Sequence, residues 1–203
     1  MLQIDDAGSG SLIGGTCIGL YLPEHNIFKY DFIPLECYTP ENFKQKKYQK
    51  YVVYIISNFF KELDIPLDEE IQLCQGYIFD FLREYLTLKG YRWNSVKIEG
   101  ALQEKVEKAF ENYAISLGLP QSYISYTKFP FHFHKLLRWV YADYDNRKQF
   151  CKSGWKSWLK YGNLPIKTSY GNMNSSGYFC LKCGKKIKAK SPIKILEFIS
   201  NKK

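Results

Sequence analysis

Residues 2–10 read Leu2-Gln3-Ile4-Asp5-Asp6-Ala7-Gly8-Ser9-Gly10, and this stretch decides how the rest of the chain is interpreted. Apolar residues alternate with polar ones up to two adjacent carboxylates, and a glycine- and serine-containing turn leads to a second apolar run over residues 13–22. Alternation with a period of two predicts a strand, and glycines permit a tight turn. The stretch therefore predicts a strand–turn–strand hairpin that carries Asp5 and Asp6 at its turn end.

The composition of the chain indicates one domain with an appendage. Its 203 residues, 45% of them apolar, are enough to form one core of ordinary size. An apolar run of about 18 residues or more is absent, and so is a basic leader with an apolar segment, so we expect neither membrane contact nor a secretory signal. The six cysteines are scattered except for the last two, which favours a reducing, cytoplasmic location over a disulfide scaffold.

The positive charge is concentrated at one end of the chain. Residues 151–203 hold 12 lysines and a single acid, Glu197, which gives +11, whereas residues 1–150 carry a net charge of −2. A basic segment commonly follows the phosphates of nucleic acid, although it can also serve only to keep a chain soluble. We therefore expect nucleic acid, DNA or RNA, as the partner of the C-terminal segment.

The hydrophobic pattern predicts strands that alternate with helices after the opening hairpin. Strands are expected at residues 2–6, 16–22, 27–37, 70–74 and 92–98, and helices at 40–63, 77–89, 101–117 and, with a break near 143–146, 131–159. This order predicts an α/β fold with a mixed five-stranded sheet, three antiparallel strands and then parallel ones, flanked by helices. The expected organisation is a domain over residues 1–160, a linker over 161–177 and a basic tail over 178–203.

The motif Asp5-Asp6-Ala7-Gly8-Ser9-Gly10 resembles the first-strand motif of ribonuclease HII, Asp-Glu-Ala-Gly-x-Gly, and the Asp-x-Gly opening of Holliday-junction resolvases. The element order over residues 1–150 is similar to that of the ribonuclease H-like superfamily. In these families the first-strand aspartate binds a divalent cation, so the resemblance implies Asp5 as a ligand, with Asp6 in the place of the ribonuclease HII glutamate. It further implies Mg²⁺ or Mn²⁺, which prefer oxygen ligands and activate water for phosphodiester hydrolysis.

The same resemblance places further acids at the end of the fourth strand and on the closing helix. The fourth predicted strand ends in Leu73-Cys74-Gln75-Gly76, so Gln75 stands where the family has an acid, and a neutral amide is a weaker ligand for a hard cation. Glu99, after the next strand, and Asp143, in the closing segment, are the candidate catalytic acids in addition to Asp5 and Asp6. Weaker candidates, whose spacing departs from the family pattern, are Asp80, Asp145, His132 and His134.

A second motif, Tyr178-Phe179-Cys180-Leu181-Lys182-Cys183-Gly184, resembles one knuckle of a zinc ribbon. The two thiolates of Cys180 and Cys183 fill only half of a tetrahedral Zn²⁺ site. Cys151 with a histidine could complete it, or a second chain could do so in a homodimer. Without such partners, the two cysteines are free thiols.

A cluster of lysines lies beside this motif, and its members are Lys182, Lys185, Lys186, Lys188 and Lys190. Lysines that are interleaved with aromatic residues suit phosphate contact combined with base stacking. We therefore expect these lysines, together with Tyr178 and Phe179, to contact nucleic acid.

The sequence leaves three functions open. The first is a metal-dependent nuclease or resolvase-like enzyme that acts on structured nucleic acid. The second is a non-catalytic ribonuclease H-like protein that only binds nucleic acid, and Gln75 favours it. The third is an actin-like phosphotransferase, which shares the element order and a glycine-rich first hairpin, but a single core argues against it because those kinases duplicate the fold.

Overall fold

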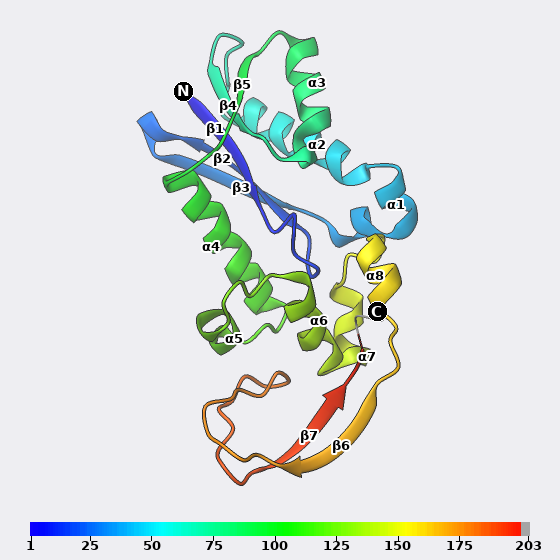
Figure 1. Ribbon diagram of the computed structural model, residues 1–203. Coiled ribbons are helices and arrows are strands. Elements are labelled where there is room, and N and C mark those ends of the chain that lie inside the picture. The colour runs from blue at the N-terminus through cyan, green and yellow to red at the C-terminus, as the bar shows by residue number, and fades with distance from the viewer. Residues whose placement is uncertain (200–203) are drawn as a thin grey trace.

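The computed structural model of the chain describes residues 1–199, and its centre is a five-stranded mixed sheet (Figure 1). The strands are β1 (Leu2–Ala7), β2 (Thr16–Leu22), β3 (Ile27–Ile33), β4 (Glu70–Cys74) and β5 (Arg92–Val96). They lie in the order β3-β2-β1-β4-β5; β1–β2 and β2–β3 are antiparallel, and β1–β4 and β4–β5 are parallel. The predicted α/β fold with a mixed sheet is confirmed. Residues 200–203, the end of the predicted basic tail, lie outside the described residues.

The central strand β1 is covered on both faces. Leu2 and Ile4 are fully buried in the core formed with α2 (Lys47–Glu62) and α3 (Asp80–Lys89). Ala7 lies in a second core, formed with α4 (Ala101–Ser116). Successive residues of a strand point to opposite faces, which is why neighbouring positions of β1 belong to different cores. Figure 1 shows α2 and α3 on one side of the sheet and α4 on the other.

Several predicted elements are shorter than expected, and the backbone explains where each one ends. The helix predicted over 40–63 is two helices, α1 (Pro40–Lys44) and α2, because Lys46 adopts a left-handed conformation with φ 54°. The strand predicted over 27–37 ends at Ile33, since Pro34 cannot donate a ladder hydrogen bond and the short helix η2 (Leu35–Tyr38) follows. Among the helices of residues 1–199, none is both long and apolar enough to cross a membrane.

The closing segment, predicted as a helix over 131–159 with a break near 143–146, is divided further, into several short helices. They are α6 (Phe133–Tyr141), α7 (Tyr144–Arg147), the single-turn η4 (Lys148–Phe150) and α8 (Lys156–Tyr161), and another short helix, α5 (Gln121–Tyr126), precedes them. The apolar side of α6 forms a third core with Leu12 and Ile13 from the turn after β1. The Gly14 amide also donates to the Phe150 carbonyl (2.8 Å), and the Lys152 amide donates to the Leu12 carbonyl (2.9 Å). The opening turn, residues 8–15 between β1 and β2, is therefore held in place by residues from the C-terminal half of the chain.

The segment predicted as a linker contains a strand. β6 (Lys167–Asn172) pairs antiparallel with β7 (Pro192–Glu197), from Lys167 opposite Glu197 to Asn172 opposite Pro192. The hairpin encloses the Cys180–Cys183 knuckle, and Figure 1 shows it as an arc beyond α6 and α7. The sequence of β6 is polar and contains glycine, so it lacks the alternation by which strands are recognised. Pairing with a distant partner, rather than local pattern, makes it a strand.

Arg147 attaches the knuckle to the body of the protein. Its buried guanidinium donates to the carbonyls of Trp139 (2.6 Å), Leu181 (2.9 Å) and Lys182 (2.7 Å), and it lies 4.1 Å from the centre of the Trp139 ring. Leu181 and Lys182 are the two residues between the cysteines, so a planar, multidentate donor fixes the backbone of the knuckle. The Ser122 hydroxyl adds a bond to the Gly184 carbonyl (2.8 Å).

We expect Arg147→Ala to release the knuckle while leaving the five-stranded sheet folded, because three carbonyls lose a charged donor. Hydrogen exchange of the amides over residues 180–187 should become faster by about tenfold or more, with β1 to β5 unchanged. Lys148→Ala, next to Arg147 but exposed, is the matched control. Unaltered exchange at the knuckle in Arg147→Ala would show that this guanidinium does not hold it.

Candidate functional site

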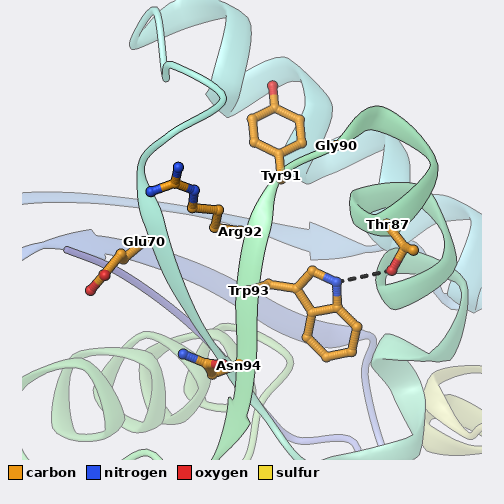
Figure 2. Close-up of a pocket in the computed structure, with 7 residues that line it drawn as sticks. All are labelled: Glu70, Thr87, Gly90, Tyr91, Arg92, Trp93 and Asn94. Atoms are coloured by element: carbon orange, nitrogen blue, oxygen red, sulfur yellow. Dashed lines mark hydrogen bonds between the residues drawn. The ribbon is translucent and has the colours of Figure 1, made fainter.

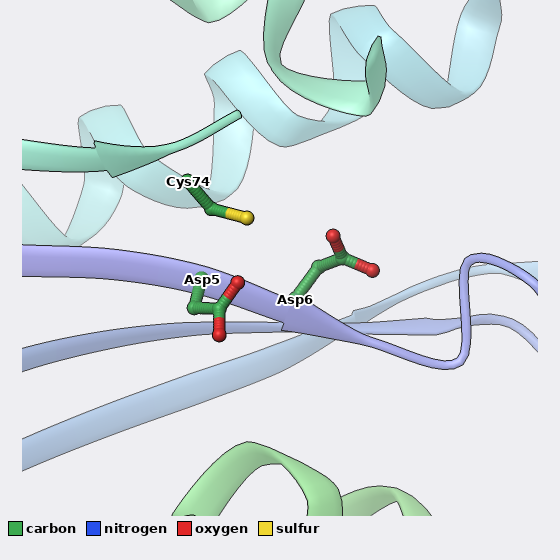
Figure 3. Close-up of side chains that lie close together, drawn as sticks. All are labelled: Asp5, Asp6 and Cys74. Carbon is green, nitrogen blue, oxygen red and sulfur yellow. The ribbon is translucent and has the colours of Figure 1, made fainter. Parts of the chain in front are cut away.

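Asp5, Asp6 and Cys74 form a cluster at the carboxyl ends of two neighbouring parallel strands. β1 pairs with β4 only as far as Ile4, which lies opposite Leu73, so the two strands are no longer paired where the acids begin. One oxygen of each carboxylate and the Cys74 sulfur lie within 4.8 Å of one another. Figure 3 shows the thiol pointing from the end of β4 toward the two carboxylates.

The three donor atoms are close enough to bind one divalent cation. Oxygen and sulfur ligands lie about 2.0–2.6 Å from such a cation, so donors up to about 5 Å apart can share it. Two carboxylates and one sulfur are a mixed donor set, with hard oxygens and one soft atom. Asp5 is buried and Asp6 and Cys74 are half-buried, so a cation here would be partly shielded from water.

Burial changes the acidity of all three side chains. Loss of water contact raises the pKa of Asp6 to about 6, although contacts with Ser9 oppose the rise. Burial also raises the pKa of Asp5, against the opposing influence of the Cys74 thiol. The pKa of Cys74 rises to about 12, first because of burial and then because of its contact with Asp5. At neutral pH the carboxylate of Asp6 is therefore ionised and the thiol is protonated until a cation displaces its proton.

A buried lysine, Lys152, contacts the turn that follows β1. Its side chain is fully buried, and its Nζ donates to the Gly8 carbonyl (2.6 Å) and to the Thr16 hydroxyl (3.2 Å). The Nζ also lies 4.6 Å from the centre of the Tyr38 ring, a favourable position for a cation. Burial lowers the pKa of Lys152 to about 7, while the charge of Asp6 raises it. Lys152 thus fixes the turn after β1 and places positive charge near Asp6.

Glycine is required where the opening turn passes α4. Gly8 has φ 84°, and a Cβ atom on it would lie 2.1 Å from the ring of Phe110. Only glycine combines this conformation with so close an approach. The Gly8 carbonyl accepts hydrogen bonds from the Ser11 amide (3.0 Å) and from the Lys152 Nζ. The residue that packs against α4 is therefore also the one that binds Lys152.

The structure does not bring the other predicted catalytic acids into this cluster. Glu99 is exposed and forms an ion pair with Lys97. Asp143 lies beside Lys182, 3.4 Å from its Nζ, at the N-terminal end of α7. Gln75 is exposed, and Cys74, one residue earlier, faces Asp5 instead. Within residues 1–199, the only group of three or more close donors from histidine, cysteine, aspartate or glutamate is Asp5, Asp6 and Cys74.

The weaker candidates also have other contacts. Asp80 forms an ion pair with Arg83 (2.8 Å), whose guanidinium donates to the carbonyls of Cys74 and Gly76. This pair holds the backbone that follows β4. His132 and His134 lie at the start of α6 with ring centres 6.0 Å apart, and Asp145 lies 3.6 Å from the Lys148 Nζ.

Cys180 and Cys183 form the tight turn that the knuckle motif predicts. The Gly184 amide donates to the Cys180 carbonyl (2.8 Å), and the Cys180 amide donates to the Lys185 carbonyl (2.9 Å). Contact with the Lys185 backbone lowers the pKa of the exposed Cys183 thiol. Cys151 does not complete the site, because it lies in the third core with its thiol directed to the Arg147 carbonyl. Zinc binding here stays a prediction that requires ligands from a second chain.

A shallow pocket lies apart from all of these residues. It has a volume of about 480 Å³ at the exposed edge of β5 and is lined by Glu70, Thr87, Gly90, Tyr91, Arg92, Trp93 and Asn94 (Figure 2). The Trp93 indole donates to the Thr87 hydroxyl (3.0 Å). The pocket has a single acid and a single arginine and therefore no cluster of metal-binding donors, so it adds nothing to the cluster of Asp5, Asp6 and Cys74.

Comparisons with protein-family models, with curated proteins and with solved structures gave no match to this chain. The function must therefore be argued from the geometry of the site itself.

Replacing Lys152 by methionine should change how stability depends on pH. The folded-state pKa of about 7 lies below the ordinary value of 10.5, so the unfolded chain binds more protons between these values. The free energy of unfolding should therefore rise by roughly 1 kcal/mol per pH unit from about pH 7 to 8.5. This slope should be missing in Lys152→Met and present in Lys156→Met, whose side chain is exposed. Urea denaturation followed by tryptophan fluorescence measures the slope, and equal slopes in all three proteins would contradict the lowered pKa of Lys152.

Proposed function

We propose that the chain is a divalent-metal-dependent nuclease of the ribonuclease H-like type. The observation that carries this proposal is the convergence of Asp5, Asp6 and Cys74 within 4.8 Å at the carboxyl end of the central strand. Three antiparallel strands followed by parallel ones are the arrangement that the motif resemblance implies. The basic C-terminal segment supplies charge of the sign that a polyanionic substrate requires.

The residues of the chain have separate roles in this proposal. Asp5, Asp6 and Cys74 hold the cation, and the contacts of Lys152 with Gly8 and Thr16 keep the turn after β1 in place. A bound cation would supply Lewis-acid polarisation of the phosphodiester and activation of the attacking water. Since Asp6 has a pKa of about 6, its carboxylate is available as a ligand at neutral pH.

The sulfur donor narrows the choice of cation. Mg²⁺ prefers six oxygen ligands, whereas Mn²⁺ and, more strongly, Zn²⁺ accept sulfur. Of the Mg²⁺ and Mn²⁺ that the motif implies, the Cys74 thiol favours Mn²⁺. This preference for Mn²⁺ over Mg²⁺ depends on the Cys74 side chain alone, and replacing Cys74 by aspartate therefore tests it.

We expect Mn²⁺-supported cleavage of branched DNA or of an RNA–DNA hybrid that falls by about 100-fold or more in Asp5→Asn, because one charged ligand is lost. Glu99→Gln removes an acid that lies outside the cluster and should cleave like the wild type. Gel analysis of labelled substrates with Mg²⁺ and with Mn²⁺ measures both. Cleavage that is unaffected by Asp5→Asn, or absent with either cation on both substrates, would refute the proposal.

Cys74→Asp should shift the cation preference, since it replaces the soft donor by a third carboxylate. The ratio of the Mg²⁺-supported rate to the Mn²⁺-supported rate should increase by about tenfold or more relative to the wild type. Cys37→Asp, at a half-buried cysteine outside the cluster, is the control. An unchanged ratio in Cys74→Asp would mean that the thiol is not a ligand.

A non-catalytic nucleic-acid-binding protein is the second candidate function. Two observations favour it: the cluster contains only two carboxylates, and the buried Lys152, which is about half protonated at neutral pH, already supplies positive charge near Asp6. Salt-dependent nucleic-acid binding that survives both EDTA and Asp5→Asn, without any cleavage, would select this function.

A further inference from the structure

A large groove separates α6 from the C-terminal hairpin and its knuckle. Its volume is about 980 Å³, at the upper end of the range of ordinary ligand pockets. α6 contributes His134, Arg138 and Tyr141 to one wall, and the knuckle and β7 contribute the other. Asp5, Asp6 and Cys74 do not line it, so the groove is a site distinct from the acid cluster.

The charge of the groove is almost entirely positive. The cations that line it are Arg138, Lys182, Lys185, Lys186, Lys188 and Lys194, and its one acid is Glu197. The Glu197 carboxylate lies 3.9 Å from the Lys167 Nζ, and the Lys182 Nζ lies 3.4 Å from the Asp143 carboxylate. The charges of Glu197 and Lys182 are therefore partly compensated. Within residues 1–199, the other five cations lie within 4.0 Å of no carboxylate. Such an excess of uncompensated positive charge is complementary to a polyanion.

Aromatic side chains lie among these cations. Tyr178 is 59% exposed, and Phe179 stacks on Tyr126 of α5 with ring centres 4.8 Å apart. On the opposite wall, Tyr141 stacks on Tyr144 and contacts Phe198. Tyr178, which is exposed, and Phe179, which is half-buried and supported by Tyr126, can therefore present ring faces to a ligand, whereas Tyr141 is buried and only supports its wall of the groove. Stacking on protein aromatics requires unpaired bases, whereas the bases of a duplex already stack on one another.

The walls of the groove are fixed before any ligand arrives. Arg147 and Ser122 hold the backbone of the knuckle through the hydrogen bonds to Leu181, Lys182 and Gly184. Six ladder positions join β6 to β7, which carries Lys194 into the groove. A binding surface organised in this way loses little conformational entropy on binding.

We propose that this groove binds single-stranded nucleic acid, with the phosphates on the lysines and Arg138 and the bases on Tyr178 and its neighbours. The inference rests on the nucleic-acid class of the proposed function but not on its metal chemistry. It deepens that function by assigning a single-stranded region of the substrate to a site outside the acid cluster.

Fluorescence anisotropy in EDTA tests this with a labelled oligothymidylate of about 15 nucleotides, a duplex of the same length, and polyglutamate as an acidic peptide. The wild type should bind the single strand at least about fivefold more tightly than the duplex. Tyr178→Ala should weaken single-strand binding about fivefold or more with an unchanged salt slope. Lys185→Ala/Lys186→Ala should weaken it and reduce the slope by about 1.4, the value for two lost phosphate contacts.

Matched changes on α2 provide the controls. Tyr54→Ala removes a tyrosine of similar exposure (55%), and Lys50→Ala/Lys61→Ala removes two exposed lysines; both should bind like the wild type. Groove variants that bind like the wild type, tighter binding of the duplex, or preference for polyglutamate would each overturn the proposal. Binding that depends on the groove but occurs without cleavage would refute only the nuclease function, whereas cleavage with unaltered binding by the groove variants would refute only this inference.

Discussion

The candidate site depends on the shortness of the parallel pairing between β1 and β4. Only three residue pairs join these strands, and the last is Ile4 with Leu73. β1 continues along β2 as far as Ala7, while β4 continues along β5 to Cys74, so the two strands have different partners beyond that point. The carboxyl ends of parallel strands are where α/β sheets offer crevices to ligands, and here three polar side chains occupy that place.

The buried ammonium of Lys152 connects this crevice with the C-terminal half of the protein. Lys152 is far from the opening turn in sequence, yet its backbone bonds to Leu12 and its Nζ bonds to Gly8 and Thr16. An ammonium removed from water is costly unless its protons are bonded and a counter-charge lies near, and the Gly8 carbonyl and Asp6 meet these needs. The Lys152 side chain thus orders the turn after β1 and also offsets part of the negative charge of Asp5 and Asp6.

Much of the fold could be predicted from local pattern, because β1, β2 and β4 alternate or are apolar and the helices α2, α3 and α4 have regular apolar spacing. The register between strands could not be predicted in this way. Beyond Ile4 and Leu73, Asp5 and Cys74 are the next residues on the two strands, and equivalent residues of neighbouring strands face the same side. The family resemblance pointed to Gln75 at the end of the fourth strand, whereas the register points to Cys74.

Lys152 and β6 were missed for a related reason. Lys152 follows Cys151 in a segment that resembles an exposed basic end of a helix, and nothing in its sequence neighbourhood signals burial. β6 is polar and becomes a strand only by pairing with β7. The arrangement of Arg138 opposite the tail lysines likewise arises from contacts between distant segments, so composition indicated the charge of the groove but not its walls.

The central claim is that Asp5, Asp6 and Cys74 bind one divalent cation together, and titration with Co²⁺ tests it most directly. A thiolate bound to Co²⁺ gives a charge-transfer absorption, and a Cys180→Ser/Cys183→Ser background removes the knuckle as a source of it. In that background we predict a band that saturates at one equivalent of Co²⁺ and disappears on adding Cys74→Ser or Asp5→Asn. No band, or a band that persists in both of those variants, would contradict the claim.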